Sequence, residues 1–245
     1  MATAMIGYLN KADAAALMVS SQNLLAPVAR LKDPHVGVQW QGTTGAEWFV
    51  ADLGSVQTVD CVRIMGLSAA TVRIRYSTLD PASGDVFDTD AVAIDQRFLT
   101  FTDLRSVLAR YVRVDLTGEG ICAAGRLYIG ELHQFSENFA WGWSRKWVDP
   151  SDRRKTEGGQ TRINRRQKYR VFSLSFEFLS DADARGFTDD IDRVNGMSED
   201  VLFIADPASP SIEQDTIWGL MTDLSPSAQQ FLDRWSKPYS IEQRL

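Results

Sequence analysis

The side chains that could do chemistry are few in this sequence, and their spacing fits no common reaction. His35 and His133 lie far apart along the chain, and neither belongs to a metal-binding motif such as H-E-x-x-H. The sequence contains no G-x-S-x-G nucleophile motif, no P-loop and no dinucleotide-binding G-x-G-x-x-G motif. We therefore expect a protein that is not an enzyme and that uses no cofactor and no metal ion.

Acidic residues are plentiful, and Asp189, Asp190 and Asp192 form a dense group. A glycosidase needs two carboxylates held about 5 to 9.5 Å apart. The acidic group, however, alternates with Phe187 and Ile191, which recur at helical spacing. This pattern indicates the solvated face of an amphipathic helix rather than a catalytic pair.

The strongest charge feature is a basic segment from Arg145 to Arg170. It contains ten Lys or Arg residues and three acidic residues, so its net charge is +7 and the rest of the chain carries −13. Glu157-Gly158-Gly159-Gln160 is typical of a hairpin tip or flexible loop. We expect this segment to dock on an acidic face of a neighbouring copy or partner. The candidate contact residues are Arg153, Arg154, Lys155, Arg165 and Arg166.

Two other interpretations of the basic segment stay open. It could be a solvated hairpin without a partner, or it could bind nucleic acid through phosphate contacts and stacking tryptophans. The pI near 5.0 and the lack of a nucleic-acid-binding motif argue against the latter. We expect no nucleic acid among the partners.

The elements that position these residues are predicted to be mostly strands. The chain has 245 residues, which is enough for two modest domains, each with a core. Short alternating apolar runs at this spacing indicate a sandwich or jelly roll. The predicted strands of the first half are Trp48–Leu53, Val59–Met65, Thr71–Ser77, Ala91–Phe101, Arg110–Leu116 and Leu127–Phe135.

The stretch 47–67 is predicted to form the central strand pair of this sandwich, with a corner at Gly54. Trp48 is expected in the core, whereas Trp40 could either bind a ligand or pack against the sandwich edge. Cys61 and Cys122 lie in or beside apolar runs, so we expect buried free thiols.

Several short motifs occur in an order that resembles discoidin, or coagulation factor 5/8 C-type, domains. The matching residues are Trp48, Asp52–Gly54, Val62–Ile64, Arg75–Ser77, Ala109–Val114 and Ile129–Leu132. The resemblance covers about residues 15–135 and implies a galactose-binding-like jelly roll. It also implies a second interpretation of function, in which Trp40 and His35 help to bind a host-surface carbohydrate. The family's Asp-Gly and Trp after Tyr-Ser are replaced here by Thr78–Pro81.

The second half, residues 136–245, is predicted to be an α+β domain. Tyr169–Leu179 alternates cleanly and is the best strand candidate, with Phe172, Leu174, Phe176 and Phe178 on its apolar face. A helix is expected over 181–194, capped by Ser180 and Asp183 and ended by Asn195-Gly196. Further strands are predicted at Val201–Ala205, Thr216–Leu224 and Tyr239–Glu242.

This order of motifs, from Phe139 to Leu245, resembles tail-tip proteins of long-tailed bacteriophages and gene transfer agents, in particular distal or minor tail proteins. The resemblance implies a virion structural protein at the tail tip or baseplate, made in the host bacterial cytoplasm. It implies ring formation with copies of itself and contacts to other tail proteins. In those families the ring-forming domain usually comes first, so the domain order here looks reversed.

No stretch approaches the roughly 18 to 20 uninterrupted apolar residues of a spanning helix, and the N-terminal residues lack the basic leader of a secretory signal. We expect no membrane insertion.

Overall fold

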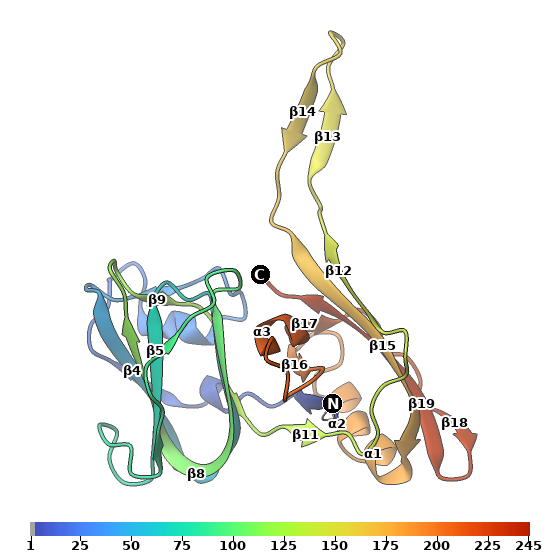
Figure 1. The fold of residues 1–245 in the computed structure, drawn as a ribbon, viewed down its shortest axis with the longest axis horizontal. Helices are drawn as coiled ribbons and strands as arrows, with labels where there is room; N and C mark the ends of the chain where they lie inside the picture. The colour runs from blue at the N-terminus through green and yellow to red at the C-terminus, as the bar shows by residue number, and fades with distance from the viewer. Residues whose placement is uncertain (1–2) are drawn as a thin grey trace.

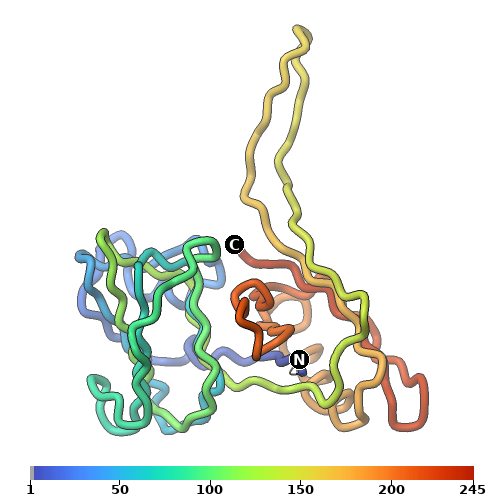
Figure 2. Tube along the Cα trace, viewed as in Figure 1, coloured from blue at the N-terminus to red at the C-terminus, as the bar shows by residue number. Residues whose placement is uncertain are grey.

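The computed structural model describes residues 3–245 and shows a mostly β protein with two lobes side by side (Figure 1). A long hairpin projects from the second lobe, as the chain trace also shows (Figure 2). The first lobe is a β-sandwich, and the second is a large antiparallel sheet with short helices. The predicted mostly β fold with an N-terminal β-sandwich is confirmed. No helix of the described residues is long and apolar enough to cross a membrane.

Two long strands dominate the sandwich, β4 (Ala46–Met65) and β8 (Thr100–Thr117), and they pair antiparallel along most of their length. The pairing is interrupted between Asp52 and Gln57, where Gly54 has a φ of +81° that favours glycine. The two strands predicted in this region are therefore one bent strand. Both of its halves face the same core, which lets the strand wrap around that core.

Shorter elements complete the sandwich. Its main sheet has the order β10-β4-β8-β5-β6, with β2 added to β4 and β7 added to β5, while β3 pairs with β9 separately. Only part of the strand expected over 91–101 forms, because a turn at residues 95–99 interrupts it. The elements are η1 (Lys11–Asp13), β2 (Ala16–Val19), η2 (Val28–Lys32), β3 (Trp40–Gln41), β5 (Thr71–Ser77), β6 (Phe87–Asp88), β7 (Val92–Ala93), β9 (Ala123–Ala124) and β10 (Leu127–Gly130).

The alternation of residues along these strands predicts which side chains share a face, but it does not predict which of the two faces is buried in the core. In β5, Val72, Ile74 and Tyr76 are buried, as expected from their spacing. In β4 the expectation for Trp48 is wrong. Phe49 fills the core instead, and Trp48 lies half-exposed on the outer face. Cys61 and Cys122 are buried free thiols, as predicted.

The second lobe is a sheet of order β11-β1-β16-β17-β19-β15-β12, with β18 paired to β19. Its core contains the apolar face of β15 and the buried faces of the two longer helices. The elements are β1 (Met5–Gly7), β11 (His133–Gln134), β12 (Ser144–Val148), β15 (Tyr169–Ser180), α1 (Asp181–Arg185), α2 (Phe187–Val194), β16 (Val201–Ile204), α3 (Ile212–Asp215), β17 (Thr216–Met221), β18 (Ala228–Phe231) and β19 (Arg234–Gln243).

The N-terminal strand belongs to the second lobe. Met5 pairs with Gln134 on one side and with Ile204 on the other, so β1 lies between β11 and β16. The sandwich thus extends from about residue 10 to about residue 131, which differs from the expected division at residues 135 and 136. The pairing of β1 with the second sheet could not be predicted from the sequence, because β1 has only three residues and its partner strands are distant in the chain.

The strand β15 and the helices after it follow their sequence signals with two differences. The Ser180 side chain accepts a hydrogen bond from the Asp183 N–H, as the capping motif predicts. Gly186 divides the expected helix into α1 and α2. A register shift after Phe176 turns Phe178 outward and Leu179 inward, because a bulge inverts the alternation.

A third apolar cluster joins the two lobes. Tyr128 of the sandwich packs against Trp218 of the second sheet, with 5.7 Å between ring centroids. Beside them the buried Arg63 donates a hydrogen bond to Glu213 at 2.8 Å. Burial of apolar surface and a shielded ion pair together hold the lobes in one arrangement.

Glu47, at the start of β4, organises one end of the sandwich. Its carboxylate accepts hydrogen bonds from the Ser20 and Ser21 hydroxyls, from the Thr43 N–H at 2.9 Å and from the Thr44 N–H at 2.8 Å. Burial alone would raise the pKa of Glu47, but these hydrogen bonds outweigh it and lower the pKa to about 2.

We predict that Glu47→Ala lowers the free energy of unfolding by about 2–3 kcal/mol at pH 7, because it removes a buried carboxylate that accepts several charge-assisted hydrogen bonds. The lowered pKa stabilises the fold above the ordinary Glu pKa of 4.5, and this stabilisation disappears as the pH falls from about 4.5 to about 2. Urea unfolding of both proteins at pH 7 and pH 3 measures the difference. A difference that stays the same or grows at pH 3 would contradict this account.

Candidate functional site

The projecting hairpin is the most distinctive candidate site. We define the arm as residues 149–168, which contain β13 (Asp152–Lys155) and β14 (Thr161–Asn164). At its tip the Thr156 N–H donates to the Gln160 carbonyl at 2.9 Å, and Gly159 has a φ of +78°. The predicted hairpin tip is therefore confirmed.

The arm gains little stability from its own contacts. All of its residues from 153 to 168 are exposed except Thr156, which is half-buried. Arg154 lies directly opposite Arg162 in the β13–β14 ladder, and like charges in this position repel. An isolated two-stranded hairpin is marginally stable in water. The arm is thus a surface without a core, anchored at one end to the sheet.

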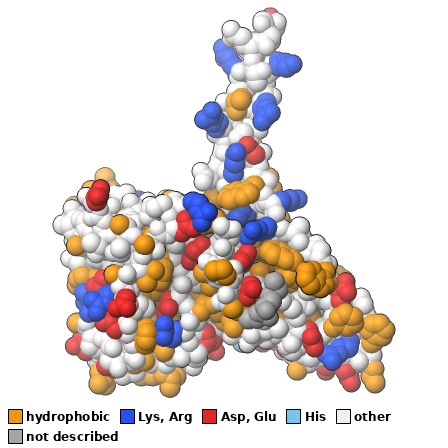
Figure 3. Space-filling model, in the orientation of Figure 1, with side chains coloured by type: hydrophobic (Ala, Val, Ile, Leu, Met, Phe, Trp, Pro, Cys, Tyr) orange, Lys and Arg blue, Asp and Glu red, His pale blue; other side chains and the backbone are white. Residues whose placement is uncertain are grey.

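All five predicted contact residues lie on the arm and are exposed. Figure 3 shows Lys and Arg side chains along the length of the projecting hairpin. Arg154 forms an ion pair with Asp152 of the same strand at 2.7 Å. Within residues 3–245 the other four, Arg153, Lys155, Arg165 and Arg166, form no ion pair. Their charges are available to a partner.

The basic segment is not uniform along its length. Arg145 and Arg170, at its two ends, belong to β12 and β15 of the large sheet rather than to the arm. Arg170 is buried, which its charge alone did not predict.

The two predicted carbohydrate contacts differ in accessibility, and only His35 can be reached by a ligand. Trp40 is fully buried, packs edge-on against Phe49 and donates its indole N–H to the Ser21 carbonyl at 3.2 Å. No face of its ring is left for a sugar, so the edge-packing interpretation is the one that fits. His35 is exposed, and its Nδ1 lies 3.0 Å from the Asp33 carboxylate.

A hollow of about 780 Å³ lies near the turn that follows β8 and was missed in the sequence. We call it the sandwich hollow. Leu67 and Ile121 contribute apolar surface, while Ser68, Gln96 and Glu119 contribute polar groups. The residues that line it come from loops far apart in the chain. In the sequence, Thr117–Gly120 gave only a turn signal.

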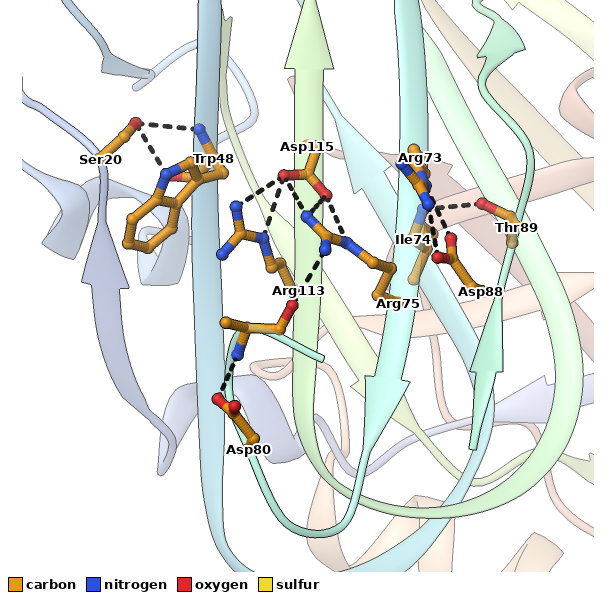
Figure 4. Close-up of polar contacts among 11 residues, drawn as sticks. Ser20, Trp48, Arg73, Ile74, Arg75, Asp80, Asp88, Thr89, Arg113 and Asp115 are labelled. Carbon is orange, nitrogen blue, oxygen red and sulfur yellow. Dashed lines mark hydrogen bonds and ion pairs between the residues drawn. The ribbon is translucent and has the colours of Figure 1, made fainter. Parts of the chain in front are cut away.

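The outer face of the sandwich carries a row of charged side chains (Figure 4). Asp115 accepts hydrogen bonds from Arg75 at 2.7 Å and forms an ion pair with Arg113 at 3.0 Å. The Arg113 guanidinium also covers the ring of Trp48, 4.4 Å from its centroid. Asp115 is shared by two arginines, and these groups pair with and cover one another, so the face stabilises the sheet and leaves little ring surface open to a ligand.

We predict that the arm contributes almost nothing to the stability of the body. A variant in which residues 151–165 are replaced by an Asn-Gly turn should keep its Tm within about 2 °C of the original, because the removed residues bury no core. Thermal unfolding followed by circular dichroism measures the change. A fall of more than about 5 °C would show that the arm supports the fold.

No family model and no curated protein matches the sequence. Solved structures resemble about half of the chain. A mutant of chitosan-binding module 1 of a Paenibacillus sp. IK-5 chitosanase/glucanase covers 51% of this chain and 100% of its own, with 18% identity and a TM-score of 0.44. The family 32 module of C. perfringens NanJ, in complex with galactose, covers 51% and 99%, with 12% identity and a TM-score of 0.43. A Streptococcus pneumoniae fucose-binding module covers 51% and 96%, with 15% identity and a TM-score of 0.41. These three solved structures are all carbohydrate-binding modules.

Proposed function

We propose that this chain is a structural subunit of an assembled particle, of the tail-tip or baseplate type that the resemblance of residues 139–245 implies. The observation that carries the proposal is the arm, a basic hairpin that extends into solvent without a core of its own. A hairpin of this kind becomes well ordered when another surface covers it.

Charge complementarity supports a second copy of the chain, or another acidic subunit, as the surface that receives the arm. The segment 145–170 carries +7, and the remainder carries −13. Opposite charges of this size speed association and fix the register of neighbouring subunits. Copies that pass arms from one to the next form a heterologous interface, which closes into a ring when the rotation between copies allows it. In this proposal the chain has a structural role and no catalytic one.

Charge reversal of the arm tests the proposal. Changing Arg153, Arg154, Lys155, Arg165 and Arg166 together to Glu should abolish assembly, because the arm would then repel the acidic surface. Mass photometry of the purified full chain should show oligomers for the original protein and a 27.4 kDa monomer for the variant. Because solvent-exposed charges are screened, the original assembly should also weaken as salt rises.

Two controls keep the result specific. Exchanging Lys for Arg and Arg for Lys at the same five positions preserves the charge and should leave assembly intact. An unchanged Tm of the charge-reversed variant shows that its fold is intact. Normal assembly of the charge-reversed variant would refute the role of the arm.

Carbohydrate recognition is a second candidate function, and the sandwich hollow is the observation that favours it. The hollow is large enough for a small ligand and combines apolar walls with a carboxylate, a hydroxyl and amide groups. Polar groups of these kinds form hydrogen bonds with sugar hydroxyls. The neighbours that resemble this half of the chain include modules for chitosan, galactose and fucose, which supplies the first ligands to try.

A glycan array that includes chitosan, galactose and fucose ligands tests this candidate with the full chain. We expect Glu119→Ala combined with Ser68→Ala to weaken binding of the selected glycan at least about tenfold, because two hydrogen-bonding groups are lost. The matched control is Glu157→Ala, which removes an exposed carboxylate from the arm tip and should leave binding unchanged. Absence of binding to any glycan would remove this candidate.

A further inference from the structure

A small hollow lies at the root of the arm, where both lobes meet it. We call it the root hollow. Its volume is about 230 Å³, and Phe98, Arg145, Trp147, Arg170 and Gln214 are among the residues that line it. Phe98 belongs to the sandwich, Gln214 to α3 and the other three to β12 and β15. None of these residues belongs to the arm or to the sandwich hollow, so the root hollow is a separate site.

Arg170 is a buried cation without an anionic partner in its hydrogen bonds. Its guanidinium donates to the Gln214 carbonyl at 3.0 Å, to the Thr216 carbonyl at 2.9 Å and to the Gln243 side-chain oxygen at 3.2 Å. These acceptors are neutral. The guanidinium also lies over three aromatic rings, at 5.5 Å from the centroid of Phe98, 5.7 Å from Phe172 and 6.0 Å from Trp147. Neutral acceptors and rings stabilise a buried cation but do not balance its charge.

The side chains around Arg170 carry more positive than negative charge, and Lys146, which also lines the root hollow, adds to the excess. Arg63 pairs with Glu213 at 2.8 Å, and Arg145 pairs with Asp215 at 2.9 Å. Arg170 has no carboxylate of its own among residues 3–245. Burial, together with the nearby Arg63 and Arg145, lowers the pKa of Arg170 to about 10. A bound anion would offset this excess.

The rest of the lining suits a ring that carries hydroxyl groups. The Trp147 side chain is 62% exposed and offers an aromatic surface, and Phe98 adds a second apolar wall. The Gln214 side-chain amide makes no hydrogen bond within residues 3–245 and can both donate to and accept from a hydroxyl. The volume lies below the roughly 300–1,000 Å³ of pockets for drug-sized ligands, so a single ring fits it better than a longer ligand.

We propose that the root hollow binds one acidic sugar residue of the hexuronic acid class. Arg145 keeps spare N–H donors beside its bond to Asp215 and binds the sugar carboxylate, with Arg170 behind it. The pyranose ring lies on Trp147, and Gln214 binds a hydroxyl. Binding at this site requires neither assembly nor the sandwich hollow, because all of its residues belong to one chain and lie outside that hollow.

Calorimetric titration of the full chain with D-glucuronate, D-glucose and acetate tests the proposal. We expect D-glucuronate to bind at least about tenfold more tightly than either of the others, because only it carries both the carboxylate and the ring. Arg145→Gln and Trp147→Ala should each weaken D-glucuronate binding about tenfold or more. Both residues are largely exposed, so these variants should fold, and their Tm checks this.

The matched controls are Arg162→Gln and Trp141→Ala, which remove the same groups from exposed positions outside the root hollow and should change affinity less than twofold. Acetate or D-glucose binding as tightly as D-glucuronate would overturn the assignment. Undetectable D-glucuronate binding, or equal binding by Arg145→Gln, would overturn it too. The charge-reversed arm variant should still bind D-glucuronate, so failure of this site and failure of assembly can be told apart.

Discussion

A hairpin with water on both faces buries no core of its own, so its position must be fixed by the structure to which it is attached. In this protein the position of the arm is fixed by β15, which lies next to the edge strand β12 of the second sheet and continues towards the arm. In the sheet β15 pairs with β19 on one side and β12 on the other, and Phe172 and Phe176 hold it against the core. The direction of the arm therefore depends on the packing of that sheet. The charges of the arm determine which partner surfaces attract it, whereas the sheet determines where in space these charges lie.

At the junction of the lobes, too, apolar packing and charged groups have different roles. Tyr128, Trp218 and their neighbours provide the apolar contact, while Arg63 crosses the junction to reach Glu213. A buried ion pair contributes little net stability compared with apolar groups of the same size, but breaking it is costly. The pair therefore opposes any shift of one lobe against the other, and it places Phe98 of the sandwich beside the root of the arm.

Local patterns in the sequence predicted local structure well. Period-two alternation located β5 and β15, a glycine pair marked the tip of the arm, and Ser180 marked the start of a helix. Alternation separates two faces without saying which one a second layer covers, and this is why Trp48 was expected in the core. The arm was predictable because its charges are consecutive in sequence.

The features that depend on distant residues were not predictable in this way. The pairing of Met5–Gly7 with β16 joins segments almost 200 residues apart, and three residues carry too little pattern to reveal it. The two hollows are formed by loops and strands from separate parts of the chain, each ordinary when read alone. Trp40 differs from the hollows in the opposite sense: it was a candidate ligand contact in a loop-rich stretch, but its side chain is fully buried.

The short strand β1 has one more consequence. It pairs with β11, and Ile6 lies opposite His133, so the chain leaves the second sheet for the sandwich and returns to it at neighbouring points. The sandwich is therefore an inserted domain, whose two ends join the adjacent strands β1 and β11 of the second sheet. Exchanging it for another domain with closely spaced ends requires a surface that covers Leu202, Ile204 and Trp218 and a partner for Glu213, while the sheet and the arm stay as they are. One body can thus present different modules to its surroundings.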